Sequence, residues 1–290
     1  MKPVHTPKSN RCSRPLSGIT SDLRKNISLT RLKSVFQQAS RRCSWPCFLA
    51  GALLEFGSSG AAIAADIQTP DDFVALFNGR DFSGWKVPEG DNSHWKVTDG
   101  VIDYDAESES RSDKSLWTGR EYGDFVLHVG WRIKETPFVN PNVFYILPDG
   151  THARDSQGKE IKLALPDSDS GILLRGSGKN QINIWCWPIG SGEMYGYRMD
   201  KNQPPEVRAA ATPRTQADKP VGQWNHYEIT VRGDRVWVIL NGKKVIENAQ
   251  MPGVPARGPI GLQHHGGKRE GKWNSPPALL QFKNIFIKEL

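Results

Sequence analysis

Apolar and polar residues alternate along most of the chain beyond about residue 70. In the stretch "DFVLHVGWRIK", every second position is apolar: Phe125, Leu127, Val129, Trp131 and Ile133. Alternate side chains of a β-strand point to opposite faces of a sheet, so this pattern predicts a strand with one buried face. The same pattern returns in "SGILLRG", "QINIWCWP", "HYEITV", "RVWVILNGKKVIE", "PIGLQHHG" and "ALLQFKNIFIKEL". No segment keeps a 3.6-residue apolar period long enough for a major helix.

Turn residues separate these strands. Gly233-Asp234 and Asn241-Gly242 predict hairpins, and Asn-Gly is the stronger signal because both residues tolerate positive φ. Ten Trp and eleven Phe can fill the space between two sheets. Residues 66–290 are therefore predicted to form a single all-β domain, a β-sandwich. Two polar stretches, starting at Pro148 and at Met199, are predicted to be long loops over one rim.

Residues 1–65 predict a basic leader with a signal peptide. A basic region ends at residue 42, and the apolar run "CFLAGALLEFGSSGAAIAA" ends in a small-x-small cleavage pattern. We expect cleavage near Ala64–Asp66 and a periplasmic or secreted protein. Glu55 interrupts the run, so no stable membrane anchor is expected. A basic arm followed by a short buried helix remains the alternative.

Charge and cysteine usage limit the possible partners. The formal net charge is +7, but residues 1–65 hold ten of the 38 Lys and Arg and two of the 31 Asp and Glu. The remaining chain has a net charge of −1, which argues against a nucleic-acid partner. Outside the leader the chain keeps only Cys186, so no disulfide and no cysteine metal site are expected.

The strand "QINIWCWP" has an unusual second face. Ile182 and Ile184 form an ordinary core face, whereas Gln181, Asn183, Trp185 and Trp187 alternate amides with indoles on the other face. Flat rings beside amide donors and acceptors are typical of sugar-binding surfaces. We therefore expect these four residues to bind a sugar ring. The alternative is a second hydrophobic layer beneath a loop.

Several ordered motifs give the chain a family likeness. They are "FVALFNGRDFSGW", "WKVTDGVI", "YGDFVLHVGWRI", "DSGILLRG", "GSGEMYGYR", "VGQWNHYEITVRGDRVWVILNGKKV" and "GPIGLQHHGG". In this order they resemble the 3-keto-disaccharide hydrolase domain of bacteria, over nearly all of residues 73–290. The resemblance implies a concanavalin A-like jelly-roll sandwich that acts on 3-oxo sugars. The family's usual Asn-Ser-Gly-Ile is here "DSGI", beginning at Asp169, and "NQINIWCWP" replaces a strand that carries acidic residues in relatives.

The implied chemistry defines which side chains are needed. A ketone at C3 acidifies the C2 hydrogen, so a base can remove it and the enolate can expel the group on C1. His265 is the expected base, because imidazole titrates near neutral pH and strand parity places Gln263 and His265 on one face. The neighbouring His264 is the competing candidate, and His265 could instead be a surface residue at a strand end.

Further candidates come from strand ends and turns. Arg175 could bind a sugar oxygen or the enolate, or form a structural ion pair. Glu193, in a Gly-rich turn beside Tyr195, could act as acid or base, with Tyr195 contacting the sugar. No cofactor is predicted. Ca²⁺ binding is conceivable through the acidic loop set, although its spacing matches no established pattern. This set comprises Asp149, His152, Asp155, Asp167 and Asp169.

Two other functions stay open. A non-catalytic, lectin-like carbohydrate-binding module would need the same sandwich and the same ring platform. A conventional glucanase would need two carboxylates in one cleft, and the sequence contains no Glu-x-Asp-x-x-Glu strand. In all three cases the expected partner is a sugar or a glycoside.

Overall fold

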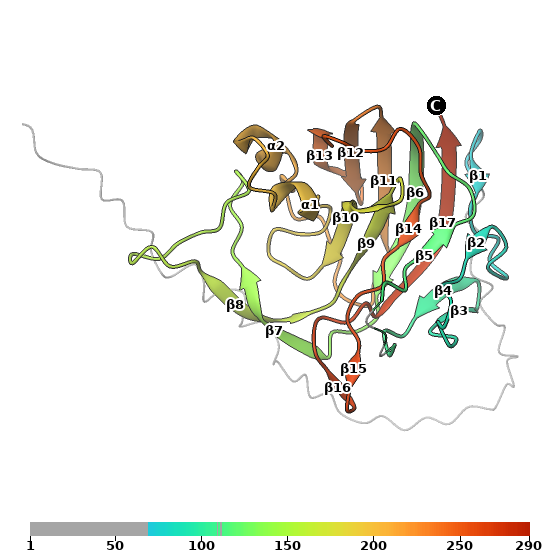
Figure 1. Cartoon of the computed structure of the whole chain (residues 1–290), viewed down its shortest axis with the longest axis horizontal. Coiled ribbons are helices and arrows are strands. Elements are labelled where there is room, and N and C mark those ends of the chain that lie inside the picture. Colours follow the sequence, from blue (N-terminus) through green and yellow to red (C-terminus); the bar gives the residue numbers. More distant parts are fainter. Residues whose placement is uncertain (1–68, 109, 111) are drawn as a thin grey trace, which may run out of the picture. The chain divides into compact units, whose positions relative to one another are not determined.

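The computed structural model describes residues 69–108, 110 and 112–290, and the predicted leader lies outside them. Most strands belong to two antiparallel sheets (Figure 1). The eight-stranded sheet has the order β13 (Lys243–Gln250), β12 (Arg235–Leu240), β11 (Asn225–Arg232), β6 (Phe125–Ile133), β17 (Leu280–Glu289), β4 (Val101–Tyr104) and β3 (Trp95–Thr98), and β1 (Val74–Ala75) also pairs with β17. The five-stranded sheet has the order β10 (Ser177–Trp185), β9 (Asp169–Leu174), β14 (Gly261–Leu262), β5 (Leu116–Thr118) and β2 (Trp85–Lys86).

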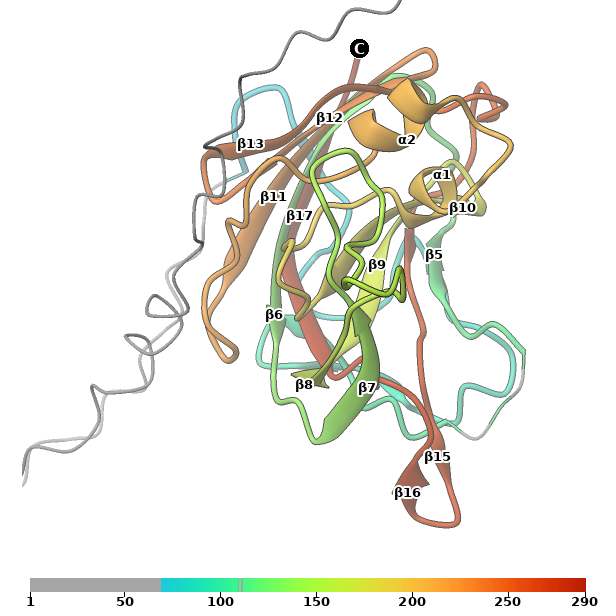
Figure 2. The ribbon, with the colours of Figure 1, turned by 90° about the vertical axis from the view of Figure 1, so that its left-hand side faces the viewer.

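Figure 2 shows the two sheets from the side. The core lies between them. All five alternating apolar residues of β6 are buried in it. The facing sheet contributes Ile172 and Leu174 from β9 and Ile182 and Ile184 from β10. Burying alternate residues of both sheets removes apolar surface from water without helices, which is the favourable term that stabilises a sandwich. The predicted all-β sandwich is confirmed.

Both predicted hairpins are present. Gly233-Asp234 joins β11 to β12, and Asn241-Gly242 joins β12 to β13. Asn241 and Gly242 have φ values of 51° and 79°, the positive values that a tight type I′ turn requires and that Asn and Gly tolerate. The turn thus sets the pairing of Leu240 with Lys243 at the start of this strand pair.

The two predicted long loops are more ordered than expected. The first contains β8 (Lys162–Asp167), which pairs with β7 (Phe138–Phe144) in a separate two-stranded sheet. The second contains the short helix α2 (Pro205–Ala210), and α1 (Tyr195–Arg198) precedes it. The prediction of loops was wrong here because β8 alternates only weakly and α2 is shorter than two turns, so neither produces a clear period. A small hairpin of β15 (Lys268–Arg269) and β16 (Lys272–Trp273) projects from the body (Figure 1).

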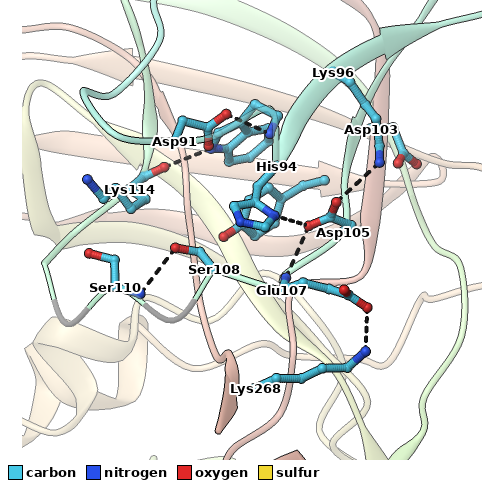
Figure 3. A network of polar contacts seen from close by, with 12 residues as sticks. Asp91, His94, Lys96, Asp103, Asp105, Glu107, Ser108, Ser110, Lys114 and Lys268 are labelled. Atoms are coloured by element: carbon cyan, nitrogen blue, oxygen red, sulfur yellow. Dashed lines mark hydrogen bonds and ion pairs between the residues drawn. The ribbon is translucent and has the colours of Figure 1, made fainter. Parts of the chain in front are cut away.

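A polar network ties the β3–β4 hairpin to its surroundings (Figure 3). Asp105 accepts hydrogen bonds from the ring of His94, from Lys96 and from the backbone N–H of Glu107. Burial alone would raise the pKa of Asp105, but these three donors hold it below its usual value. Glu107 in turn pairs with Lys268 of β15, so the network links the hairpin to the far end of the chain. No described helix has the length and apolar character needed to span a bilayer.

Candidate active site

A hollow of about 280 Å³ opens on the outer face of the five-stranded sheet. Since Ile182 and Ile184 of β10 point into the sandwich, the alternate residues of that strand point into this hollow. Its lining combines residues from β9, from β10 and the segment after it, from α1 and from the segment after β14: Asp169, Gln181, Asn183, Trp185, Trp187, Tyr195, Gln263 and His265. Seven of the nine residues expected from the sequence are therefore brought together.

The two tryptophans are stacked on each other. Their ring centroids lie 4.1 Å apart with an interplanar angle of 3°. Trp185 Nε1 donates to Gly190 O at 2.6 Å and Trp187 Nε1 donates to Asp167 Oδ2 at 2.9 Å, which fixes both rings. Trp185 is only 3% exposed, whereas Trp187 is half-buried. The pair thus lies outside the sandwich core. Because Trp185 is covered, it is mainly the ring of Trp187 that can stack on a sugar, and the two rings do not form one platform.

The amides of the hollow are oriented by one another. Gln181 Nε2 donates to Ser170 O at 3.1 Å and to Gln263 Oε1 at 2.8 Å. Because Gln263 Oε1 is an acceptor in this arrangement, its Nε2 group can donate to a ligand. Asn183 Oδ1 is buried and accepts no hydrogen bond from the described residues. The hollow therefore offers one oriented donor and one unsatisfied acceptor, which suits a sugar hydroxyl or carbonyl.

His265 and Asp169 form the ionisable pair of the hollow. His265 Nδ1 lies 2.7 Å from Pro276 O, and since a carbonyl only accepts, Nδ1 carries the proton. This tautomer leaves Nε2 as the basic nitrogen, 3.7 Å from Asp169 Oδ2. Burial raises the pKa of Asp169 to about 6; a positive charge on His265 would oppose this rise, and Asp167 adds to it. The neighbouring His264 instead places its ring edge-on against Tyr104, at 5.8 Å.

Arg175 is outside this hollow. Its guanidinium is 2% exposed and donates to the carbonyls of Gly123, Gly233 and Pro255 and to Asp124 Oδ1 at 2.9 Å. Every guanidinium nitrogen is thus engaged within the protein, so none remains for a sugar or an enolate. We correct the expected role: Arg175 forms the structural ion pair that the sequence left open. It connects the end of β9 to three segments, at Gly123-Asp124, Gly233 and Pro255.

Glu193 is also withdrawn from the surface. It is 0% exposed and forms an ion pair with the buried Arg198 of α1. Burial raises the pKa of Glu193 to about 7, while the charge and hydrogen bond of Arg198 oppose that rise. In this position Glu193 cannot reach over the tryptophans as an acid or base. Its sequence neighbour Tyr195 does line the hollow and is 45% exposed.

The acidic loop set is dispersed. Asp149 and Asp155 accept backbone N–H bonds within their own turns, from Thr151 and from Gln157 and Lys159. Asp167 accepts hydrogen bonds from the side chains of Asn140 and Trp187, and Asp169 faces His265. In the part of the chain that the structure describes, no three His, Cys, Asp or Glu side chains gather as metal ligands. The structure therefore gives the Ca²⁺ hypothesis no support.

The comparisons with known proteins identify the family of this chain. The sequence profile of the 3-keto-alpha-glucoside-1,2-lyase-like domain matches residues 72–288. The chain belongs to this family. Membership makes it a carbohydrate-active protein.

Individual relatives of this family member are distant. A 3-keto-disaccharide hydrolase of Bacteroides thetaiotaomicron is 24% identical over 110 residues, which cover 35% of this chain and 37% of the relative. A candidate glycosyl hydrolase structure from Parabacteroides distasonis has 22% identity and a TM-score of 0.49, covering 76% of this chain and 84% of the other. The β-glucanase of Bacillus licheniformis has 13% identity and a TM-score of 0.40, covering 75% and 97%.

Proposed function

We propose that this family member is an exported enzyme that cleaves 3-keto-glycosides by removing the proton on C2. Family membership supports the class of substrate. The observation that carries the reaction is the pair of His265 and Asp169 in a hollow that also holds a stacked tryptophan pair and oriented amides. Export rests on the leader predicted from residues 1–65.

In the proposed first step, His265 Nε2 takes the C2 proton and the C–H electron pair becomes the C2–C3 enolate. His265 is suited to this because its hydrogen bond to Pro276 O places the proton of the neutral ring on Nδ1, so that the lone pair is on Nε2. The imidazolium so formed faces the Asp169 carboxylate 3.7 Å away, which stabilises the new positive charge. The Nε2 group of Gln263, held by Gln181, is the proposed donor to the enolate oxygen.

In the second step the enolate electrons form a C1–C2 double bond and the C3 ketone returns as the C1–O bond breaks. The departing oxygen takes the proton from His265. Water then adds at C1 and a proton returns to C2, so the net reaction consumes one water and regenerates the base. Two carboxylates are not needed, and Asp169 is the one carboxylate among the described residues lining the hollow, which gives a conventional glucanase mechanism no support.

The test is turnover of a 3-keto-glucoside by the purified protein, followed by release of its aglycone. The matched comparison is His265→Ala against His226→Ala, because His226 lies on β11 of the other sheet. We expect the first variant to lose about 100-fold or more in kcat and the second to match the parent. Normal turnover by His265→Ala would remove that residue from the mechanism, and no turnover by the parent would refute the proposal.

One observation favours the lectin-like alternative. Of the three residues expected to be catalytic, only His265 lines the hollow, since Arg175 and Glu193 are buried in ion pairs. A binding module needs only the tryptophans and amides. Calorimetry with unoxidised disaccharides, beside the turnover assay, distinguishes the two functions. Tight binding with no product over days, together with no turnover of the 3-keto-glucoside, would establish the binding module.

A further inference from the structure

A second and larger hollow, of about 520 Å³, lies beside helix α1. Four cationic side chains line it: Arg154, Arg198, Lys201 and Arg208. Glu160 is the one acidic side chain among the described residues in its lining. Even after Glu160 and the buried Glu193 are counted against these four, two positive charges remain. The hollow therefore has a positive character that the nearly neutral body of the protein does not share.

Arg198 is the fixed element of this second hollow. It is 1% exposed, and its Nε pairs with Glu193. Its Nη1 donates to Gly150 O at 3.3 Å and to His152 Nε2 at 3.1 Å. Its Nη2 donates to no acceptor among the described residues. A guanidinium held on one edge and free on the other is preorganised to bind an oxyanion, because little side-chain entropy is lost on binding.

His152 supports this arrangement as a neutral ring. Burial lowers its pKa, and the charge of Arg198 lowers it further. Neutral His152 accepts from Arg198 through Nε2, so its Nδ1–H faces Glu160 Oε1 at 3.3 Å. Glu160 also pairs with Arg154 at 3.2 Å. The single carboxylate of this hollow is thus already engaged, and it does not neutralise Arg198 or Lys201.

Two aromatic contacts connect the second hollow to the site with His265. Tyr195 lines the first hollow, and its ring centroid lies 6.0 Å from the guanidinium carbon of Arg198. Phe144 stacks on His152 of the second hollow at 4.1 Å and lies 6.2 Å from the ring of Trp187 of the first. Both hollows therefore lie close to the same two rings, Tyr195 and Phe144.

We propose that the second hollow binds the carboxylate of an acidic sugar whose neighbouring ring lies in the first hollow. This inference rests on the proposed function for the identity of the reacting ring. The acidic unit is the one joined at C1, so the substrates are 3-keto-glycosides of uronic acids. Arg198 binds the carboxylate, and Lys201 and Arg154 add attraction from the rim.

Calorimetry tests this binding without turnover. The three ligands are a glucosyl-glucuronic acid, its methyl ester, and a sulfate ester of the matching neutral disaccharide. We expect the acid to bind about tenfold more tightly than its methyl ester, as for a hydrogen bond between charged groups. Equal binding of acid and ester, or no binding of either at millimolar concentration, would overturn the proposal. Binding of the sulfate ester in preference to the acid would replace a carboxylate with a sulfate as the ligand.

Variants locate the effect. Lys201→Ala should reduce the preference for the acid about threefold, because exposed pairs contribute little individually, and Arg154→Ala combined with it should reduce it further. Lys243→Ala, an exposed lysine of β13, is the matched control and should leave the preference unchanged. An acid preference equal to that of the parent in the double variant would refute the assignment. Turnover of an uncharged 3-keto-glucoside is measured separately, so its failure would count against the proposed reaction alone.

Discussion

Replacing Asp169 by Asn should weaken catalysis and strengthen the fold at the same time. The substitution keeps the shape of the side chain but removes the negative charge 3.7 Å from His265 Nε2. In the proposed mechanism that charge stabilises the imidazolium formed when His265 takes the C2 proton. The same charge is unfavourable in the resting protein, because burial raises the pKa of Asp169.

The size of the catalytic loss follows from the distance. Two unit charges about 4 Å apart attract by about 4 kcal/mol when the effective dielectric constant is about 20. The side chains of His265 and Asp169 are 34% and 28% exposed, so water screens part of this attraction. Halving the value leaves about 2 kcal/mol, and since about 1.4 kcal/mol is a factor of ten in rate, Asp169→Asn should lose about 30-fold in kcat.

The pH dependence has opposite signs for activity and stability. The pKa of Asp169 rises from 3.8 to about 6 on folding, so between these values the folded state binds more protons than the unfolded state. The parent should therefore lose stability as pH rises from about 4 to 6, by about 2 kcal/mol after discounting for exposure. Its activity should rise over the upper part of that window as the carboxylate ionises. Asp169→Asn should be the more stable protein at pH 7, with the difference vanishing near pH 4.

Urea unfolding and kcat measured from pH 4 to pH 8 check both effects. Asp155→Asn is the matched control, because Asp155 lies in an exposed turn whose hydrogen bonds an Asn oxygen can accept equally. If Asp169→Asn kept full activity at pH 7, the carboxylate would not stabilise a charge on His265. If it were also no more stable than the parent, the raised pKa would be wrong as well.

Three further variants separate roles within the molecule. Trp187→Ala should raise KM about tenfold while kcat changes little, since it removes the half-buried ring of the stacked pair; equal KM values would exclude Trp187 from sugar binding. Arg175→Met should lower the free energy of unfolding by about 3 kcal/mol, because three carbonyls and Asp124 lose their donor. The kcat per folded molecule should not change, and a selective loss of kcat would restore a catalytic role for Arg175. Gln263→Ala should reduce kcat about tenfold with normal stability, and a kcat equal to the parent would show that the enolate has another donor.

Strand parity predicted the fold and much of the hollow. One rule, that alternate residues face opposite sides, placed the five apolar residues of β6 in the core and gathered Gln181, Asn183 and Trp185 on the outer face. The rule is reliable because half of each strand must face the core. It cannot show how two indoles on one face orient, and here Trp187 covers Trp185 because each ring nitrogen has its own hydrogen-bond acceptor.

The charged residues were harder to place from the sequence. Arg175 sits at φ 50°, just past the end of β9, and this backbone conformation turns its side chain away from the parity of the strand. Asp169 was grouped with loop carboxylates, although it begins β9 and lies on the outer face opposite Trp185 in the register. The sequence did offer one signal, because Asp169 replaces the family's usual Asn. That difference pointed to position 169 but not to His265, which faces it.

The buried pair of Glu193 and Arg198 keeps the carboxylate of a conspicuous turn out of the lining of the hollow that holds His265. A buried guanidinium without a counter-charge would cost several kcal/mol, so Glu193 allows Arg198 to be held rigidly beneath Tyr195. Burial raises the pKa of Glu193, and the charge and hydrogen bond of the neighbouring Arg198 limit this rise. Glu193 thus acts through Arg198, as a positioning residue for the second hollow. Glu193→Gln should therefore lose the preference for the acid over its methyl ester. Turnover of an uncharged substrate should remain normal in this variant.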